Sequence, residues 1–144
     1  MGGHPRGAPL PRPPRRARAD HGRVVRRRPA GGPRTVDAFD FDVERGEVSG
    51  RRTLVRLEAD DGSPDGLAVD DDGHLWVAVY GAGAVRRYTP GGREVAQVRL
   101  PVTQPTCSWF GGPGRDLLFV TTCWEHFDAA QRARQPDAGR VFVA

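Results

Sequence analysis

The sequence contains no Lys, no Ile and no Asn, so all 22 of its basic residues are Arg. Its two Cys are too few for a disulfide-rich scaffold. No apolar run approaches the roughly 20 residues that a membrane-spanning helix requires, which excludes a helical membrane protein. What remains is a chain of 144 residues with 38% hydrophobic side chains, enough for the core of one domain of ordinary size.

The charges are divided unevenly between two regions. Residues 1–34 contain ten Arg and one acid, a net charge of +9, whereas residues 35–144 contain twelve Arg and seventeen acids, a net charge of −5. Together they give the formal net charge of +4. We therefore divide the chain into a basic arm, residues 1–34, and a mildly acidic body, residues 35–144.

The basic arm consists mostly of Pro, Gly, Arg and Ala. Such a composition buries too little apolar surface to offset the entropy of ordering, so we expect the arm to be disordered. It lacks the apolar segment of a secretory signal. The run Arg26-Arg27-Arg28 could bind nucleic-acid phosphates by counterion release. Because it has no interleaved aromatic residues, it is more typical of a solvated tail, and nucleic acid is not the expected partner.

The body has the pattern of an all-β protein, with short apolar or alternating runs between turn residues. Leu75 to Tyr80 is apolar throughout, which predicts a strand covered on both faces, and Leu117 to Thr122 is predicted to be a second buried strand. Asp60 to Gly66 and Asp71-Asp72-Gly73 are rich in turn residues. The expected strands are 35–42, 48–57, 67–70, 75–80, 85–89, 94–100, 106–110, 117–122 and 140–143.

The strands of the body repeat. Leu75-Trp76-Val77 aligns with Leu117-Leu118-Phe119 at a shift of 42 residues, and Pro64 aligns with Pro105 at a shift of 41. A period of roughly 40–45 residues with four strands per unit is typical of a β-propeller blade. The alternative is a small β-sandwich, which would show strands without the repeat.

Several motifs follow one another in a fixed order between Thr35 and Cys123. They are Val36-Asp37-Ala38-Phe39-Asp40-Phe41-Asp42, Pro64-Asp65-Gly66-Leu67-Ala68-Val69-Asp70, Gly73-His74-Leu75-Trp76-Val77-Ala78, Gly83-Ala84-Val85-Arg86-Arg87, Leu100-Pro101, Pro105-Thr106 and Phe110-Gly111-Gly112. Together they resemble the family of regucalcin (senescence marker protein), gluconolactonase and luciferin-regenerating enzyme. Members of that family are six-bladed propellers with one divalent metal on the central axis, and many hydrolyse sugar lactones, so the resemblance implies this fold and this substrate class.

The family's Pro-Asp-Gly-Leu motif carries a metal-ligand aspartate, and Asp65 occupies that position here. The resemblance implies that Asp65 binds a divalent metal (Ca²⁺, Mn²⁺, Mg²⁺ or Zn²⁺) and acts as the catalytic base. A carboxylate is a suitable ligand for a hard cation, which can polarise a lactone carbonyl and activate water. Without the family, the same tripeptide would be interpreted as a turn that its own Asp side chain stabilises.

The sequence also departs from the family. The segment that would carry a metal-binding glutamate and the sugar-contacting residues has no counterpart, and the family's ligand asparagine cannot be present in a chain without Asn. About 110 residues then correspond to two to three blades. We therefore expect a truncated lactonase with weak or no metal binding. The alternatives are a calcium- or metal-binding module and a fragment that self-associates through open propeller edges.

The arm ends abruptly at Thr35, where the family pattern begins. GC-rich codons read out of frame tend to give Arg, Pro, Gly and Ala. We hypothesise that residues 1–34 are a frameshifted or mis-started translation of a propeller segment and do not belong to the fold.

Other candidate residues are weaker. Cys107, Cys123 and His126 lack regular zinc spacing, as do His4, His21 and His74. We expect both Cys to pack as small buried groups, which fits a reducing cytoplasm. Asp70-Asp71-Asp72-Gly73 lacks the spacing of an EF-hand loop and is predicted to be a hairpin turn. We expect the three Trp to pack within or between blades; they are Trp76, Trp109 and Trp124.

Overall fold

The computed structural model describes residues 23–27 and 34–144 of the chain. The described elements are β1 (Arg23–Arg27), β2 (Thr35–Asp42), β3 (Glu47–Arg56), the 3₁₀ turn η1 (Ala59–Asp61), β4 (Ser63–Val69), β5 (Leu75–Tyr80), β6 (Ala84–Tyr88), β7 (Glu94–Arg99), β8 (Pro105–Gly111), β9 (Leu117–Thr122), α1 (Ala129–Arg134) and β10 (Val141–Val143). The all-β prediction is confirmed. Within the described ranges no helix is long and apolar enough to cross a membrane.

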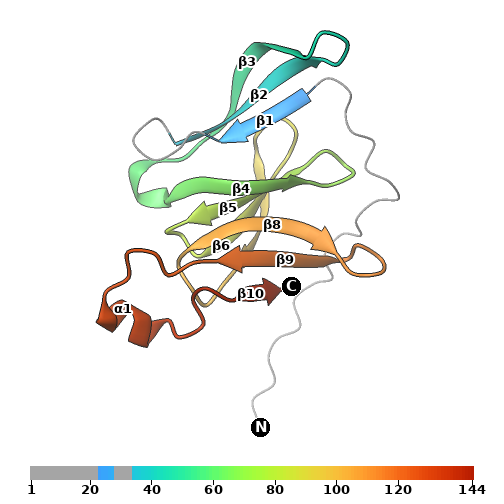
Figure 1. The fold of residues 1–144 in the computed structure, drawn as a ribbon. Coiled ribbons are helices and arrows are strands. Elements are labelled where there is room, and N and C mark those ends of the chain that lie inside the picture. Colours follow the sequence, from blue (N-terminus) through green and yellow to red (C-terminus); the bar gives the residue numbers. More distant parts are fainter. Residues whose placement is uncertain (1–22, 28–33) are drawn as a thin grey trace.

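The strands form three antiparallel sheets, which follow one another in the chain (Figure 1). Sheet A has the order β1-β2-β3, sheet B the order β4-β5-β6-β7, and sheet C the order β10-β9-β8. Sheet B is the predicted four-strand unit, and sheet C begins the same unit again. The sheets stack as three layers, so the two-sheet sandwich that the sequence left open is not what forms.

Sheet B is the middle layer, and the alternation of β5 explains why. Leu75, Val77 and Val79 belong to an apolar cluster with Val36 and Val55 of sheet A. The residue between the first two, Trp76, belongs to a second cluster shared with β9 of sheet C. Because successive side chains of a strand point to opposite faces, a strand between two sheets must be apolar throughout. The prediction that both faces of β5 are covered is confirmed.

Sheet C is buried on one face only. In β9, Leu118 and Val120 are fully buried, whereas Leu117 is 38% exposed. The prediction of a wholly buried strand at 117–122 is therefore wrong, because no further layer covers the other face of sheet C among the described residues. Trp76 is buried as predicted, but Trp109 is 68% exposed for the same reason.

The turn predicted over Asp60 to Gly66 is wrong in its second half. Only η1 and Gly62 form the turn, and β4 begins at Ser63. The Pro-Asp-Gly tripeptide, typical of a turn, lies inside the strand because Asp65 and Gly66 form a bulge in the pairing with β5. The long segment after β9, predicted to be polar and irregular, contains α1.

Residues 23–27, which the sequence assigned to the basic arm, form β1 and pair with β2 over Val36 to Asp40. The rest of the predicted arm, 1–22 and 28–33, lies outside the described residues, as does Arg28 of the arginine run. The proposed boundary at residue 34 stays a prediction.

Candidate functional site

Asp65 lies near the start of β4, the first strand of sheet B. The pairing of β4 with β5 shifts between Pro64 and Leu67, so that Asp65 and Gly66 together oppose a single residue of β5. A bulge of this kind changes the direction of the side chain that it contains and is common beside active sites. Asp65 is half-buried. The strand therefore gives this carboxylate an orientation that regular pairing would not give.

The same construction recurs in sheet C. β8 begins with Pro105, the counterpart of Pro64 in β4, and its pairing with β9 shifts between Pro105 and Cys107. β4 and β8 lie side by side, each at an edge of its sheet (Figure 1). The shift of 41 residues seen in the sequence thus corresponds to two equivalent first strands. Asp65 and Thr106 occupy equivalent positions on them, and only the first of these residues is an acid.

Gly66 allows these two strands to approach each other. A Cβ atom at Gly66 would lie 2.5 Å from Cys107 Sγ and 2.7 Å from Cys107 Cα, closer than non-bonded carbon contacts allow. Glycine is therefore required here by close packing. Cys107 itself is exposed and Cys123 half-buried, so the prediction that both pack as buried groups is wrong.

Three polar side chains, those of Tyr80, Gln104 and Cys123, are linked to one another near the end of β5. The thiol of Cys123 donates to Gln104 Oε1 at 3.3 Å, and the Cys123 backbone N–H donates to the Gln104 carbonyl at 3.0 Å. Tyr80 ends β5 and pairs in register with Ser63. Burial raises the pKa of the Tyr80 phenol, and Cys123, Glu125 and the charge of Asp65 raise it further. The phenol consequently stays protonated at neutral pH and is a hydrogen-bond donor for a ligand near Asp65.

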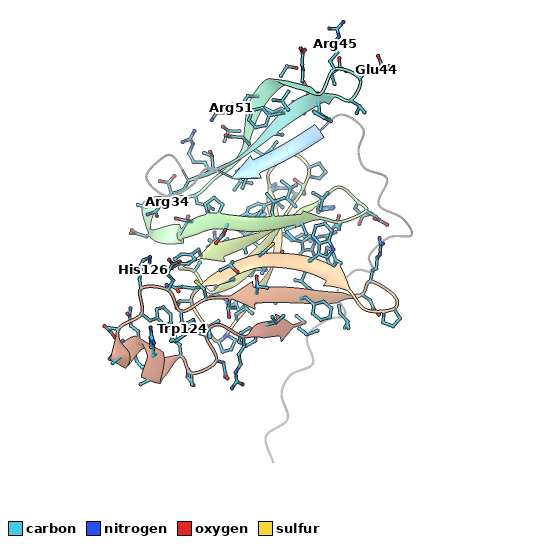
Figure 2. All side chains as sticks on the ribbon, viewed as in Figure 1. Arg34, Glu44, Arg45, Arg51, Trp124 and His126 are labelled. Atoms are coloured by element: carbon cyan, nitrogen blue, oxygen red, sulfur yellow. The ribbon has the colours of Figure 1, made fainter. Side chains whose placement is uncertain are left out.

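The segment after β9 lies beside this end of β4. Figure 2 shows Trp124 and His126 on the segment between β9 and α1, far from Arg45 and Arg51 on sheet A. The guanidinium of Arg132 stacks on Trp124 at 3.8 Å, and Gln135 Oε1 accepts from the Thr103 backbone N–H at 2.7 Å. These two contacts hold α1 and the residue after it against Trp124 and Thr103. Trp124 nevertheless remains 48% exposed. Its predicted role as blade packing is therefore wrong.

A second set of candidate ligands lies at the other end of β4. Asp70, Asp72 and His74 offer ligand atoms that all lie within 4.8 Å of one another. They occupy the hairpin between β4 and β5, as predicted for this turn, with Gly73 N–H donating to the Asp70 carbonyl at 2.9 Å. Their spacing alone would suit a cation.

The hydrogen bonds of Asp70 argue against a cation. Its Oδ1 accepts from the backbone N–H groups of Asp72 and His74 at 3.1 and 2.8 Å. Its Oδ2 accepts from Trp76 Nε1 at 2.9 Å and from Arg87 Nη2 at 2.6 Å. Burial acts to raise the pKa of Asp70, but the bonds from Trp76, Arg87 and His74 outweigh it and lower this pKa. The carboxylate is neutralised by an arginine inside the fold, so the cluster is a structural hairpin anchor.

The described residues supply Asp65 as one carboxylate, and they bring no set of three His, Cys, Asp or Glu ligands together around it. Cys107, Cys123 and His126 form no such set within the described part of the chain either. A Ca²⁺ ion takes six to eight oxygen ligands. The residues present at Asp65 therefore do not complete a metal site.

The sequence analysis did not identify the residues of this polar group, which are Tyr80, Gln104 and Cys123. The repeat in the sequence could have indicated where these residues lie. The shift of 42 residues aligns the end of β5 with the end of β9, and adjacent antiparallel strands run in opposite directions. Residues that end these second strands must therefore lie beside residues that begin the first strands.

Comparison with known proteins connects this geometry to a family. Residues 31–124 match the family described as SMP-30/Gluconolactonase/LRE-like region. Regucalcin of Xenopus laevis is 41% identical to this chain over 108 residues, which are 74% of this chain and 36% of the relative. The chain thus spans about a third of the length of the curated relatives that it matches.

Two solved structures are similar over most of the chain. One is a calcium-binding protein, regucalcin, from Agrobacterium tumefaciens, with a TM-score of 0.71 and 32% identity over 76% of this chain and 38% of that one. The other is a luciferin-regenerating enzyme, with a TM-score of 0.74 and 28% identity over 87% of this chain and 41% of that one.

Proposed function

Because the chain belongs to the SMP-30/gluconolactonase/LRE-like family, we propose that it carries part of the site of a divalent-metal-dependent sugar-lactone hydrolase. Asp65 is the ligand of the metal and the general base of this site. The substrate is a small sugar lactone, and the metal is Ca²⁺, Mn²⁺, Mg²⁺ or Zn²⁺. The free thiols of Cys107 and Cys123 fit a reducing compartment such as the cytoplasm.

The position of Asp65 supports this proposal most. It is a half-buried carboxylate in the bulge of a first strand, next to the equivalent strand of the following sheet. First strands of successive propeller blades surround the central axis, which makes their ends the place for an axial ligand. We interpret sheets A, B and C as two to three blades of a six-bladed propeller, of which sheet B is a complete one.

The site is incomplete in this chain. Asp65 contributes one carboxylate where a hard cation takes at least six ligands. The matched relatives are almost three times as long as the segment they share with this chain. We propose that metal binding by the chain alone is weak and that lactone hydrolysis requires further ligands and substrate contacts. No catalytic step through a metal is therefore assigned to these residues.

A lactone assay combined with calorimetric metal titration tests the proposal. Hydrolysis of a six-carbon sugar lactone is followed by acid release with each of the four metals, for the native chain, Asp65→Asn and Asp72→Asn. Asp72 is the matched control, since it is an exposed acid of the hairpin at the other end of β4. We expect weak metal binding that Asp65→Asn removes and Asp72→Asn retains, with turnover near the uncatalysed rate. Metal binding or metal-dependent turnover that survives in Asp65→Asn would contradict the role of Asp65.

A second candidate is a calcium-binding module without hydrolytic activity. The observation that favours it is the similarity to a structure described as a calcium-binding protein at 32% identity. The same experiment separates the two candidates. Calcium binding that depends on Asp65, together with an absence of turnover when the chain is supplemented with the remaining part of a relative, would favour the module.

A further inference from the structure

The side chain of Tyr80 lies on the same face of sheet B as the bulge that contains Asp65. Side chains alternate along β5, so Tyr80 points to the same side as Trp76, which belongs to the apolar cluster shared with sheet C. Ala78 lies between them on that side, and it is the residue that Asp65 and Gly66 together oppose. Gly66 in turn packs against sheet C. The phenol and the bulge therefore both face sheet C, at the same end of sheet B.

The hydroxyl of Tyr80 has a weak partner within the chain. Its neighbour is the thiol of Cys123, whose own proton is donated to Gln104 Oε1 at 3.3 Å. The Cys123 backbone is fixed as well, because its N–H donates to the Gln104 carbonyl at 3.0 Å and Gln104 is only 9% exposed. The thiol thus offers the phenol a sulfur atom, which is a weak hydrogen-bond acceptor. An oxygen atom of a bound ligand is a stronger acceptor and would replace it.

Negative charge near the phenol limits which ligands suit it. Burial is the main cause that raises the pKa of Tyr80, and the charges of Glu125 and Asp65 raise it further. The same carboxylates would repel a ligand that carries its own negative charge. An uncharged molecule rich in hydroxyl and carbonyl oxygens would accept from the phenol without this repulsion.

The other tyrosine of the chain, Tyr88, differs in its access to ligands. It is 3% exposed and belongs to the apolar cluster between sheets A and B. Its hydroxyl has no hydrogen-bond partner among the described residues, and its burial keeps ligands in solution away from it. Tyr80, in contrast, is only partly buried and is the last residue of its strand. Of the two phenols, only that of Tyr80 is placed to meet a ligand.

From this arrangement we infer that Tyr80 is a substrate-binding residue, whose hydroxyl donates a hydrogen bond to an oxygen of an uncharged sugar lactone beside Asp65. Cys123 and Gln104 are positioning residues, since they act by fixing the phenol. Tyr80 keeps its proton throughout, so it orients the lactone and takes no part in proton transfer. The identity of the ligand as a lactone rests on the proposed function, whereas the placement of the phenol does not.

Aromatic carbon-13 NMR of the full chain tests this inference, because its two tyrosines give separate ring signals. The signals are assigned with Tyr88→Phe. The probe is a six-carbon sugar lactam, a stable and uncharged amide analogue of the lactone. It is added at constant Ca²⁺ to about 50 mM, because a weak site has a dissociation constant in the millimolar range. We expect the Tyr80 signals to shift and to saturate, while those of Tyr88 stay in place.

Tyr80→Phe removes the hydroxyl and keeps the ring. It should raise the dissociation constant of the lactam roughly three- to tenfold, the effect of losing one hydrogen bond. The NMR signals of the lactam itself give this constant. Tyr88→Phe is the matched control and should leave the constant unchanged within about twofold. Circular dichroism confirms that both variants are folded.

Three outcomes would each overturn the inference: Tyr80 signals that do not move, Tyr88 signals that move equally, or a Tyr80→Phe chain that binds the lactam as tightly as the native chain. A 6-phosphate ester of the lactam that shifts the Tyr80 signals more strongly would overturn the preference for an uncharged ligand. Failure of the proposed function looks different, because metal binding would then survive Asp65→Asn whatever the lactam does at Tyr80.

Discussion

The two ends of strand β4 each carry an aspartate in a different environment. At the far end, Asp70 receives hydrogen bonds on both oxygens from its own hairpin, from Trp76 and from Arg87. At the near end, Asp65 lies in a bulge beside the close contact of Gly66 with Cys107. At the far end, both carboxylate oxygens of the aspartate are hydrogen-bonded within the fold. At the near end, the aspartate lies where sheets B and C meet.

This difference shows that proximity of ligand atoms does not identify a metal site. The ligand atoms of Asp70, Asp72 and His74 lie within 4.8 Å of one another, yet an arginine already neutralises the Asp70 carboxylate. A divalent cation would have to displace or repel that guanidinium. Asp65, in contrast, lies in a bulge, an irregular geometry that is common beside functional sites. We therefore expect substitution of Asp70 to lower the stability of the chain and substitution of Asp65 to weaken metal binding.

The largest effect is expected at the far end. Asp70→Ala removes the nearer partner of Arg87, whose side chain is only 12% exposed, and leaves it only the longer contact with Asp72 Oδ2 at 3.4 Å. Breaking a buried pair in this way should lower the free energy of unfolding by about 3 kcal/mol, measured by urea denaturation. Asp65→Asn should cost less than about 1 kcal/mol in the same experiment. Equal losses for the two substitutions would remove the distinction between the two ends.

The second effect concerns the near end. Gly66→Ala places a methyl group against Cys107 and must push β4 and β8 apart, so it should destabilise the chain by roughly 1–3 kcal/mol. Gly91→Ala is the control, because the nearest atom to its Cβ, Thr89 Oγ1, lies at an ordinary 3.8 Å. The thermal midpoints of the two variants give the comparison. A Gly66→Ala chain as stable as Gly91→Ala would show that the two strands are not closely packed at Asp65.

A smaller effect is expected from pH. The pKa of Asp70 is lowered in the folded chain, so its carboxylate contributes stability above the ordinary Asp pKa and loses it as the pH falls through the folded value. Between about pH 4 and pH 2, the native chain should therefore lose more stability than Asp70→Asn. Urea unfolding at pH 7, 5, 4 and 3 measures both curves. Parallel curves would mean that the pKa of Asp70 is not lowered in the folded chain.

The sequence allowed much of the fold to be predicted. Periodic apolar residues gave the bounds of β2, β5 and β9 as the structure has them, and the repeat correctly indicated a four-stranded sheet followed by the start of another. These features depend on local alternation and on turn residues, which one sequence contains. The prediction failed where it depended on whether another layer covers a given face of a sheet. Whether Trp109 is covered depends on a layer that no local pattern reveals.

The sequence allowed one residue of the candidate site, Asp65, to be predicted, but not the polar residues that accompany it. The motif around Asp65 identified a position, but local turn chemistry assigned it wrongly to a turn, because Pro-Asp-Gly in a bulge has the same composition as in a turn. Tyr80 of sheet B meets Cys123, which follows β9 of sheet C, only when these two sheets pack together. Hydrogen bonds such as that of Cys123 with Gln104 depend on this packing and leave no periodic signal.

Terbium luminescence tests most directly which end of β4 takes a metal. Tb³⁺ prefers the oxygen ligands of Ca²⁺, and excitation of a nearby aromatic side chain makes it luminesce. Tyr80 is close enough for the charge of Asp65 to act on its phenol, and Trp76 contacts Asp70. We expect a weak signal that excess Ca²⁺ displaces, that Asp65→Asn abolishes and that Asp72→Asn leaves unchanged. A signal that survives Asp65→Asn and disappears with Asp72→Asn would place the metal at the hairpin and contradict the account.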